Sequence, residues 1–271
     1  MRVMELSSSP PSQVVVDSPN HAGPSPASQA DKFAAVKLIL GRSHQSDLKH
    51  ELGLEDTREF ARLMREPLQS MEQEWRSNGS PTDMENFKYI TEGRARDPIP
   101  VHIMSELLAD PAGPTESDFD AGHDGMTALH FLNEEISSAA RLQLHHVALR
   151  LYTSSSYRFF NKPMRDGTKP HPIRVTMYVL DETLKKIRTV EARFHPERYN
   201  QTKVLWRGMR DRDLDLGTGL APMSTSENKF VAESFATGNQ RGLVFRCNSR
   251  GNSKGVCIDF LSLFPNEVEY L

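Results

Sequence analysis

The sequence predicts an α+β protein in which helices come first and a mixed, mostly antiparallel sheet follows. Between about residues 48 and 75, and again between about 127 and 160, apolar side chains recur every three or four positions, the spacing of a helix with one buried face. After residue 172, short runs rich in β-branched and aromatic residues are separated by Gly, Pro and Asn, a pattern typical of strands and turns. A chain of 271 residues is long enough for one large domain or two small ones.

Composition narrows the class of protein. Hydrophobic residues make up 37% and charged residues 25% of the chain, which are values of a globular protein. The net charge of −3 and the lack of a Lys/Arg-rich tract argue against a nucleic-acid partner. No apolar run reaches the roughly 18 residues of a membrane span, and the N-terminus has no apolar core of a secretory signal, so we expect a cytoplasmic protein without a membrane partner.

The first part of the chain divides into two predicted regions. Residues 1–45 are rich in Ser, Pro, Gly and Ala without periodicity, and we expect a disordered tail. Residues 46–124 form a helical N-terminal region, in which Asp56 with Glu59 resembles a capping box. Pro67 is favourable only in a first turn, so it should divide the helical stretch in two. A further short helix is expected at 101–108.

Residues 125–271 are predicted to form a second region, helical to about residue 160 and stopped by Pro163 and Gly167. Ser226 is expected to be the N-cap of a short helix. Cys247 and Cys257 flank a turn and could face each other across a hairpin as reduced thiols, since two thiols alone make no metal site. The segments expected as strands are 173–180, 203–209, 216–226, 242–248, 255–260 and the terminal EVEYL, residues 267–271.

The terminal segment FLSLFPNEVEYL carries two carboxylates, Glu267 and Glu269, two residues apart after a Phe-Pro-Asn turn. In an extended chain such residues point to one face. Two carboxylates on one face repel each other unless a cation or a proton donor lies between them, so the pair suits a site that stabilises positive charge. An exposed, charged edge strand is the alternative interpretation of this pair.

Two further features precede this pair. Arg207 is followed by Gly208 at the end of a predicted strand, where a guanidinium can pair with a phosphate and glycine allows close approach to the backbone. Ser224, Thr225 and Ser226 lead into the short helix, and Ser224 could hydrogen-bond a carboxylate on a neighbouring strand. Each feature alone is weak, and Arg207 lying along Trp206 with its head group in water is a sufficient structural explanation.

Together, Arg207, the Ser-Thr-Ser run and the Glu-x-Glu pair resemble the R-S-E class of arginine-specific mono-ADP-ribosyltransferases. The segments that carry the resemblance are ALRLYTSSSYRFFNKPMR (148–165), LWRGM (205–209), APMSTSENKFVAESFA (221–236) and GVCIDFLSLFPNEVEYL (255–271). The resemblance covers about residues 125–271 and implies a β-sandwich-like NAD-binding core as the catalytic domain. It implies an NAD(P)⁺–protein-arginine ADP-ribosyltransferase that uses NAD as a substrate, releases nicotinamide and needs no metal.

The resemblance also implies roles for individual residues. Glu269 matches the catalytic glutamate that stabilises an oxocarbenium-like ribose, and Glu267 matches the residue that receives the acceptor guanidinium. Arg207 matches the residue that holds the NAD phosphates, Gly208 offers its backbone to the nicotinamide amide, and Ser224 orients Glu269. The remaining matched residues shape the pocket: Thr225, Ser226 and Phe235.

The chain departs from the family in stopping at Leu271, where members carry further strands, so we expect a catalytic domain incomplete at its C-terminus. An acceptor protein or small molecule that carries a guanidinium is the expected partner, besides NAD. Three alternatives remain: an NAD glycohydrolase with water as acceptor, a catalytically inactive domain that binds NAD or a protein, and an unrelated interaction module.

Overall fold

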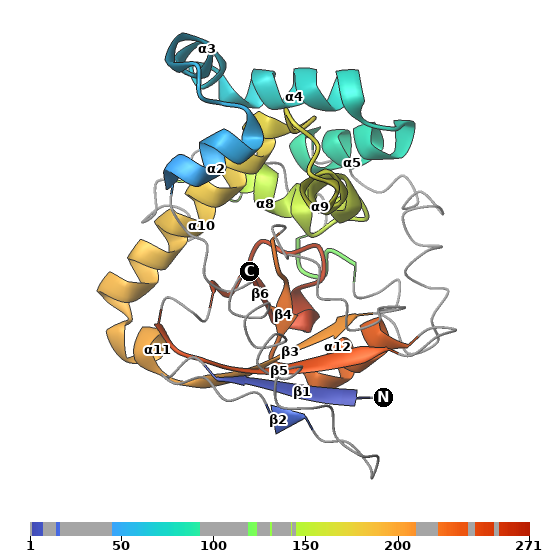
Figure 1. The fold of residues 1–271 in the computed structure, drawn as a ribbon, viewed down its shortest axis with the longest axis vertical. Helices are drawn as coiled ribbons and strands as arrows, with labels where there is room; N and C mark the ends of the chain where they lie inside the picture. Colours follow the sequence, from blue (N-terminus) through green and yellow to red (C-terminus); the bar gives the residue numbers. More distant parts are fainter. Residues whose placement is uncertain are drawn as a thin grey trace, which may run out of the picture.

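The computed structural model describes residues 2–7, 15–16, 45–92, 119–123, 131, 142, 145–209, 222–237, 242–251 and 255–271. The protein is α+β, with a group of helices gathered above a single described sheet (Figure 1). The helices are α2 (Gln45–Leu52), α3 (Thr57–Leu63), α4 (Pro67–Asn78), α5 (Pro81–Glu92), α8 (His146–Tyr152), α9 (Tyr157–Asp166), α10 (Arg174–Phe194), α11 (Pro196–Asn200), α12 (Lys229–Ala236) and the 3₁₀ turn η4 (Pro265–Glu267). The strands are β1 (Arg2–Ser7), β2 (Val15–Val16), β3 (Lys203–Met209), β4 (Thr225–Ser226), β5 (Leu243–Ser249) and β6 (Glu269–Tyr270).

The sheet is mixed and mostly antiparallel, as the sequence predicts. Its strand order is β2-β1-β5-β3-β4-β6. Strands β1 and β5 pair in parallel, and the other neighbouring strands pair antiparallel. The long central ladder joins β3 to β5, from Lys203 opposite Ser249 to Met209 opposite Leu243. The short strands β4 and β6 pair through Ser226 opposite Glu269, so the topology brings the Ser-Thr-Ser run beside the terminal glutamates.

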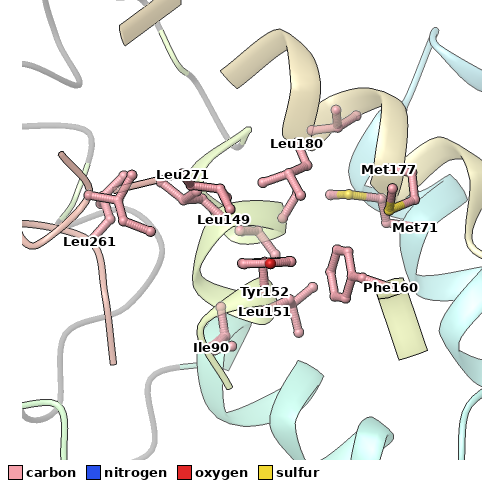
Figure 2. Close-up of a cluster of buried hydrophobic side chains, with 14 of the residues drawn as sticks. Met71, Ile90, Leu149, Leu151, Tyr152, Phe160, Met177, Leu180, Leu261 and Leu271 are labelled. Carbon is pink, nitrogen blue, oxygen red and sulfur yellow. The ribbon is translucent and has the colours of Figure 1, made fainter. Parts of the chain in front are cut away.

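The helices share one apolar core that reaches from α2 to the C-terminal residue. Figure 2 shows Tyr152 and Leu151 of α8 beside Phe160 of α9, with Leu271 on the far side of the same cluster. Trp75 of α4 is fully buried, and its indole N–H donates to the Thr176 hydroxyl at 3.0 Å. The core therefore combines residues from both regions into which the sequence analysis divides positions 46–271.

The strand predicted at 173–180 is wrong, because these residues form the N-cap and the first third of α10. Nearly all of them are buried, so the run is apolar on every side and its periodicity does not separate a strand from a helix. The first turn of α10 is capped by another helix: the Glu74 carboxylate on α4 accepts from the backbone N–H groups of Val175 (2.7 Å) and Thr176 (3.1 Å). A cap supplied from a distant helix leaves no local signal in the sequence.

The hairpin predicted between 242–248 and 255–260 is also wrong. The first segment is the central strand β5, whose two edges are occupied by β3 and β1. The second segment turns away and pairs with the C-terminus: Val256 exchanges backbone hydrogen bonds with Leu271, and Ile258 donates to the Glu269 carbonyl at 2.9 Å. Cys247 and Cys257 are both buried as free thiols in one apolar cluster, without the predicted strand pairing between them.

Several local predictions are confirmed. Asp56 caps α3 by accepting from the N–H groups of the following residues, and Pro67 begins α4. Gly167 ends α9 in the left-handed conformation, whereas Pro163 lies inside that helix rather than stopping it. The strand at 203–209 has the predicted bounds.

Other predictions differ or go untested. Helix α5 lies within the region predicted to be helical, whereas β1 and β2 lie within the segment predicted to be disordered. The helix predicted at 101–108 falls outside the described residues. Within the described part of the chain, no helix has the length and apolarity that a membrane crossing requires.

Glycine at position 208 is required by packing. A Cβ there would lie 1.8 Å from the backbone carbonyl oxygen of Ala232, because α12 lies directly on β3 at this point. Gly242 meets Ala236 of the same helix in the same way, at 1.7 Å. The small residues of α12 thus seat the helix against the two central strands, and this seating places its other side chains around the end of β3.

Gly208→Ala is expected to lower the free energy of unfolding by about 3 kcal/mol, because backbone rather than a flexible side chain must move to admit the methyl group. Urea denaturation measures the change. Val204→Ala, on the same strand at a side chain that is 36% exposed, is the matched control and should cost much less. A Gly208→Ala protein as stable as this control would contradict the close seating of α12.

Candidate active site

A pocket of about 380 Å³ opens between helices α8 and α9 on one side and β3, β4, α12 and the terminal glutamates on the other. It gathers every site residue proposed from the sequence. These residues are Arg207, Gly208, Ser224, Thr225, Ser226, Phe235, Glu267 and Glu269. Positions separated by more than 60 residues in the chain therefore meet in one concave surface.

Arg207 lies at the centre of the cationic side of this pocket. Its Nη1 donates to the backbone carbonyl of Ser224 at 2.6 Å, which ties β3 to the segment before β4. Burial lowers the pKa of its guanidinium, and the nearby Arg165 cation acts in the same direction. Arg165, on α9, lines the same pocket. Two guanidinium groups in one half-enclosed space favour an anionic ligand such as a phosphate.

Glu269 is the buried carboxylate of the pocket, with 8% of its surface exposed. Burial raises its pKa from the ordinary value of 4.5 to about 7. Hydrogen bonds from the Ser224 and Ser262 side chains and the Arg207 charge favour the ionised form and limit this rise. Ser224 thus favours the ionised form of Glu269, and Ser262, which the sequence motifs do not indicate, acts in the same direction. The pocket therefore holds a carboxylate whose pKa lies well above that of an exposed glutamate.

The two glutamates reach the pocket by a different geometry from the predicted one. Glu267 belongs to the 3₁₀ turn η4, and Val268 has the left-handed conformation with φ 46° and ψ 60°. Only at Glu269 does the extended strand β6 begin. The prediction that both side chains share one face of an extended segment is wrong. Both line the pocket nevertheless, Glu267 half-buried and Glu269 buried.

The prediction that Ser226 caps the following helix is wrong. Asn228 is the N-cap of α12, and its side chain accepts from the N–H of Phe230 at 3.0 Å. The Ser226 hydroxyl instead accepts from the N–H of Asn228 and donates to the carbonyl of Glu267. Ser226 therefore joins the start of α12 to the turn that carries Glu267.

The sequence motifs do not indicate the individual residues on the opposite wall of the pocket. This wall comes from the hydroxyl-rich turn after α8 and from one face of α9, including Arg158, Asn161 and Arg165. Their spacing of three and four is that of one helix face, which was a readable signal. Tyr152 belongs to the same wall; burial raises the pKa of its phenol to about 12, so it stays protonated, and its hydroxyl donates to the Pro222 carbonyl.

The arrangement of groups fits a molecule that combines phosphates with a developing cation. Arg207 and the buried carboxylate of Glu269 lie on one side, Arg165 lies on the facing wall, and the aromatic side chains of Tyr157, Trp206 and Phe235 also line the space. A carboxylate in a water-poor pocket stabilises an oxocarbenium-like ribose, as it does in glycoside cleavage. Among the residues that the structure describes, no group of three or more metal-ligating side chains gathers.

Comparison with known proteins does not extend these observations: no protein family, curated protein or solved structure matches this chain.

The hydrogen bond between Ser224 and Glu269 leads to a testable pH effect. Ser224→Ala removes a group that favours the ionised carboxylate, so the pKa of Glu269 should rise above about 7. A ¹³C-labelled glutamate side chain followed by NMR across pH 5 to 9 would measure this rise. Thr225→Ala is the control, since its hydroxyl contacts the Tyr270 carbonyl instead. An unchanged titration in Ser224→Ala would contradict the contact.

Proposed function

We propose that this protein is a mono-ADP-ribosyltransferase that transfers ADP-ribose from NAD to the guanidinium of an arginine-type acceptor. The observation that carries the proposal is the meeting of Arg207, Ser224 and Glu269 in one pocket, with Glu267 at a less buried position beside them. The resemblance of the motifs supplies the reaction, and the geometry supplies groups with the required charges in reach of one ligand.

Each group has a task in this reaction. Arg207, supported by Arg165, binds the pyrophosphate of NAD, and the aromatic walls hold the nicotinamide. The bond between ribose C1′ and the nicotinamide nitrogen breaks, its electron pair stays on nicotinamide, and neutral nicotinamide leaves. The ionised Glu269 stabilises the positive charge that develops on the ribose.

Glu267 acts on the acceptor. Its carboxylate binds the guanidinium by charge-assisted hydrogen bonds and orients one nitrogen towards C1′. That nitrogen uses an electron pair to form the new bond and loses a proton, which passes to Glu267 and then to water. Glu267 suits this step because it is half-buried rather than enclosed, so an acceptor and water can both reach it.

Nicotinamide release from NAD, measured with and without agmatine, tests the proposal. Release that rises with agmatine and yields ADP-ribosyl-agmatine is the expected result. Release that is indifferent to agmatine would favour the glycohydrolase with water as acceptor. No release in either condition would contradict both enzymatic functions and would leave a non-catalytic binding domain.

Glu267→Gln is expected to separate transfer from cleavage. Removing the charge that binds the guanidinium should lower transfer to agmatine roughly 100-fold, because hydrogen bonds to charged groups contribute most. Nicotinamide release without agmatine should change little, since Glu269 and Arg207 remain. Product analysis by chromatography measures both rates in one reaction, and an equal loss of the two would contradict the role given to Glu267.

A further inference from the structure

The residue between the two glutamates has an unusual backbone. Val268 is left-handed, with φ 46°, and the other non-glycine residue of the described chain with positive φ is Asp120. Aspartate tolerates this conformation, whereas a β-branched side chain is strongly disfavoured in it. A conformation of this kind persists only where the surrounding structure imposes it, and such residues gather at functional sites.

The contacts around Val268 show what imposes the conformation. Its N–H donates to the Pro265 carbonyl at 3.3 Å, and its own carbonyl accepts from the Glu227 N–H at 3.4 Å. On one side, the Ser226 hydroxyl holds the Glu267 carbonyl; on the other, Glu269 pairs with Ser226 across β4 and β6. The backbone is thus fixed before, at and after residue 268.

The side chain of Val268 adds an anchor. It packs against an apolar cluster formed by Leu205, Leu243, Phe245, Cys247, Cys257 and Tyr270. A smaller or polar side chain at position 268 would still allow the same backbone conformation, but it would lose this apolar packing. This partial burial of the valine side chain therefore offsets part of the strain of its backbone and favours one conformation of the turn.

The consequence of this turn is that the two carboxylates occupy different environments. In an extended segment, Glu267 and Glu269 would lie roughly 7 Å apart on one face with similar exposure. The left-handed residue instead ends a 3₁₀ turn and begins a strand, so that Glu269 is buried while Glu267 stays at an accessible position.

We infer that Val268 is a positioning residue that sets the place of Glu267 relative to Glu269 and thereby determines whether ADP-ribose passes to a guanidinium or to water. This inference rests on the proposed function. Attack by a guanidinium nitrogen needs the acceptor held within about 3.5 Å of C1′, and a displacement of about 1 Å can cost 100-fold in rate. Water reaches the same carbon without a fixed partner on Glu267, so hydrolysis is much less sensitive to the turn.

The test compares Val268→Gly and Val268→Asn with the wild-type protein. Both replacements accept a left-handed backbone and remove the apolar anchor, so the fold can persist while the turn loosens. The readout is the ratio of ADP-ribosyl-agmatine to ADP-ribose formed at saturating NAD over a range of agmatine concentrations. This ratio does not depend on how much of each protein is active, so a loss of folded protein alone cannot move it.

We expect the ratio to fall about tenfold in both variants, with a higher KM for agmatine and with nicotinamide release within about twofold of wild type. Val204→Gly, the same chemical change on β3, is the matched control and should leave the ratio unchanged. An unchanged ratio in both Val268 variants would overturn the inference while the proposed function stands. Equal loss of transfer and hydrolysis would overturn it too, since Val268 would then support the whole site. If the wild-type protein releases no nicotinamide, the proposed function falls and the inference falls with it.

Discussion

Glu269→Gln is expected to lower nicotinamide release from NAD roughly 1000-fold, with or without agmatine. The amide has the shape of the carboxyl group and lacks the charge, so the variant isolates the electrostatic contribution to a cationic transition state; removing one preorganised group of this kind typically costs 100- to 1000-fold. Initial rates of nicotinamide formation measure the loss. A variant that keeps a tenth or more of the wild-type rate would contradict the role of Glu269.

The same variant should become more stable relative to wild type as the pH rises. The pKa of Glu269 is raised by burial from 4.5 to about 7 in the folded protein, so the folded state holds this proton more tightly than the unfolded state. Stability linked to this group is present in full below pH 4.5 and is lost as the pH rises through about 7. Glutamine does not titrate, so the difference between the two proteins reports this group alone.

Between pH 5 and pH 8 the free energy of unfolding of Glu269→Gln should therefore gain roughly 2.5 kcal/mol on that of wild type. Urea denaturation at both pH values measures the gain. If the variant is inactive and gains stability at high pH, then Glu269 supports activity while its ionisation lowers the stability of the folded protein. A difference that does not vary with pH would mean that the carboxyl group is not held in a low-dielectric pocket.

The activity of the wild-type protein should follow the same titration. Since the ionised carboxylate is the active form, kcat/KM for NAD should rise with pH up to about 7 and then level off. The positive nicotinamide ring of bound NAD favours the ionised form, so the corresponding rise in kcat should occur at lower pH. The order of these two midpoints is a check that does not depend on their absolute values.

The parts of the fold that the sequence predicts correctly are those with local causes. Strand β3 has the bounds that the sequence predicts, and Asp56 and Pro67 mark helix starts through their own side chains. The first third of α10 was misassigned because the causes of its structure are distant. Its residues are nearly all buried, and the carboxylate that caps it belongs to Glu74, on another helix.

The candidate site shows the same division. Arg207, Ser224 and Glu269 could be predicted as site residues from the chemistry of their side chains. The sheet topology brings them into one pocket. The path of the chain between them does not follow from local sequence. Neither the left-handed Val268 nor the hydroxyl of Ser226 on the Glu267 carbonyl could be anticipated, because both depend on the pairing of β4 with β6.

The second large effect is expected at a buried ion pair that supports the segment leading to the glutamates. Asp120 and Arg150 are each 1% exposed, and Arg150 Nη2 donates to both carboxylate oxygens, at 3.0 and 2.8 Å. Arg150 Nη1 donates to the Leu261 carbonyl, and the Asp120 N–H donates to the Leu263 carbonyl at 2.6 Å. The pair thus fixes residues 261–263, from which the chain continues to Glu267.

Asp120→Asn is expected to lower the free energy of unfolding by about 3 to 5 kcal/mol, because the Arg150 guanidinium would remain buried without its counter-charge. Asparagine accepts the left-handed backbone of position 120, where φ is 50°, so the loss is that of the charge and not of the chain path. Urea denaturation at pH 7 measures the loss.

The double variant Asp120→Asn/Arg150→Met is the control for this explanation. It leaves no charge behind, so it should be more stable than Asp120→Asn alone, although it contains one more substitution. Acid should also narrow the gap between wild type and Asp120→Asn. Burial raises the pKa of Asp120, but hydrogen bonds from His123 and Arg150 and the Arg150 charge outweigh it, so the net pKa lies below 3.8. Stability from this carboxylate is therefore present above pH 3.8 and is lost as the pH falls through the lower pKa of the folded state. A double variant less stable than Asp120→Asn would show that residues 261–263 depend on the hydrogen bonds of the guanidinium rather than on the balance of charge.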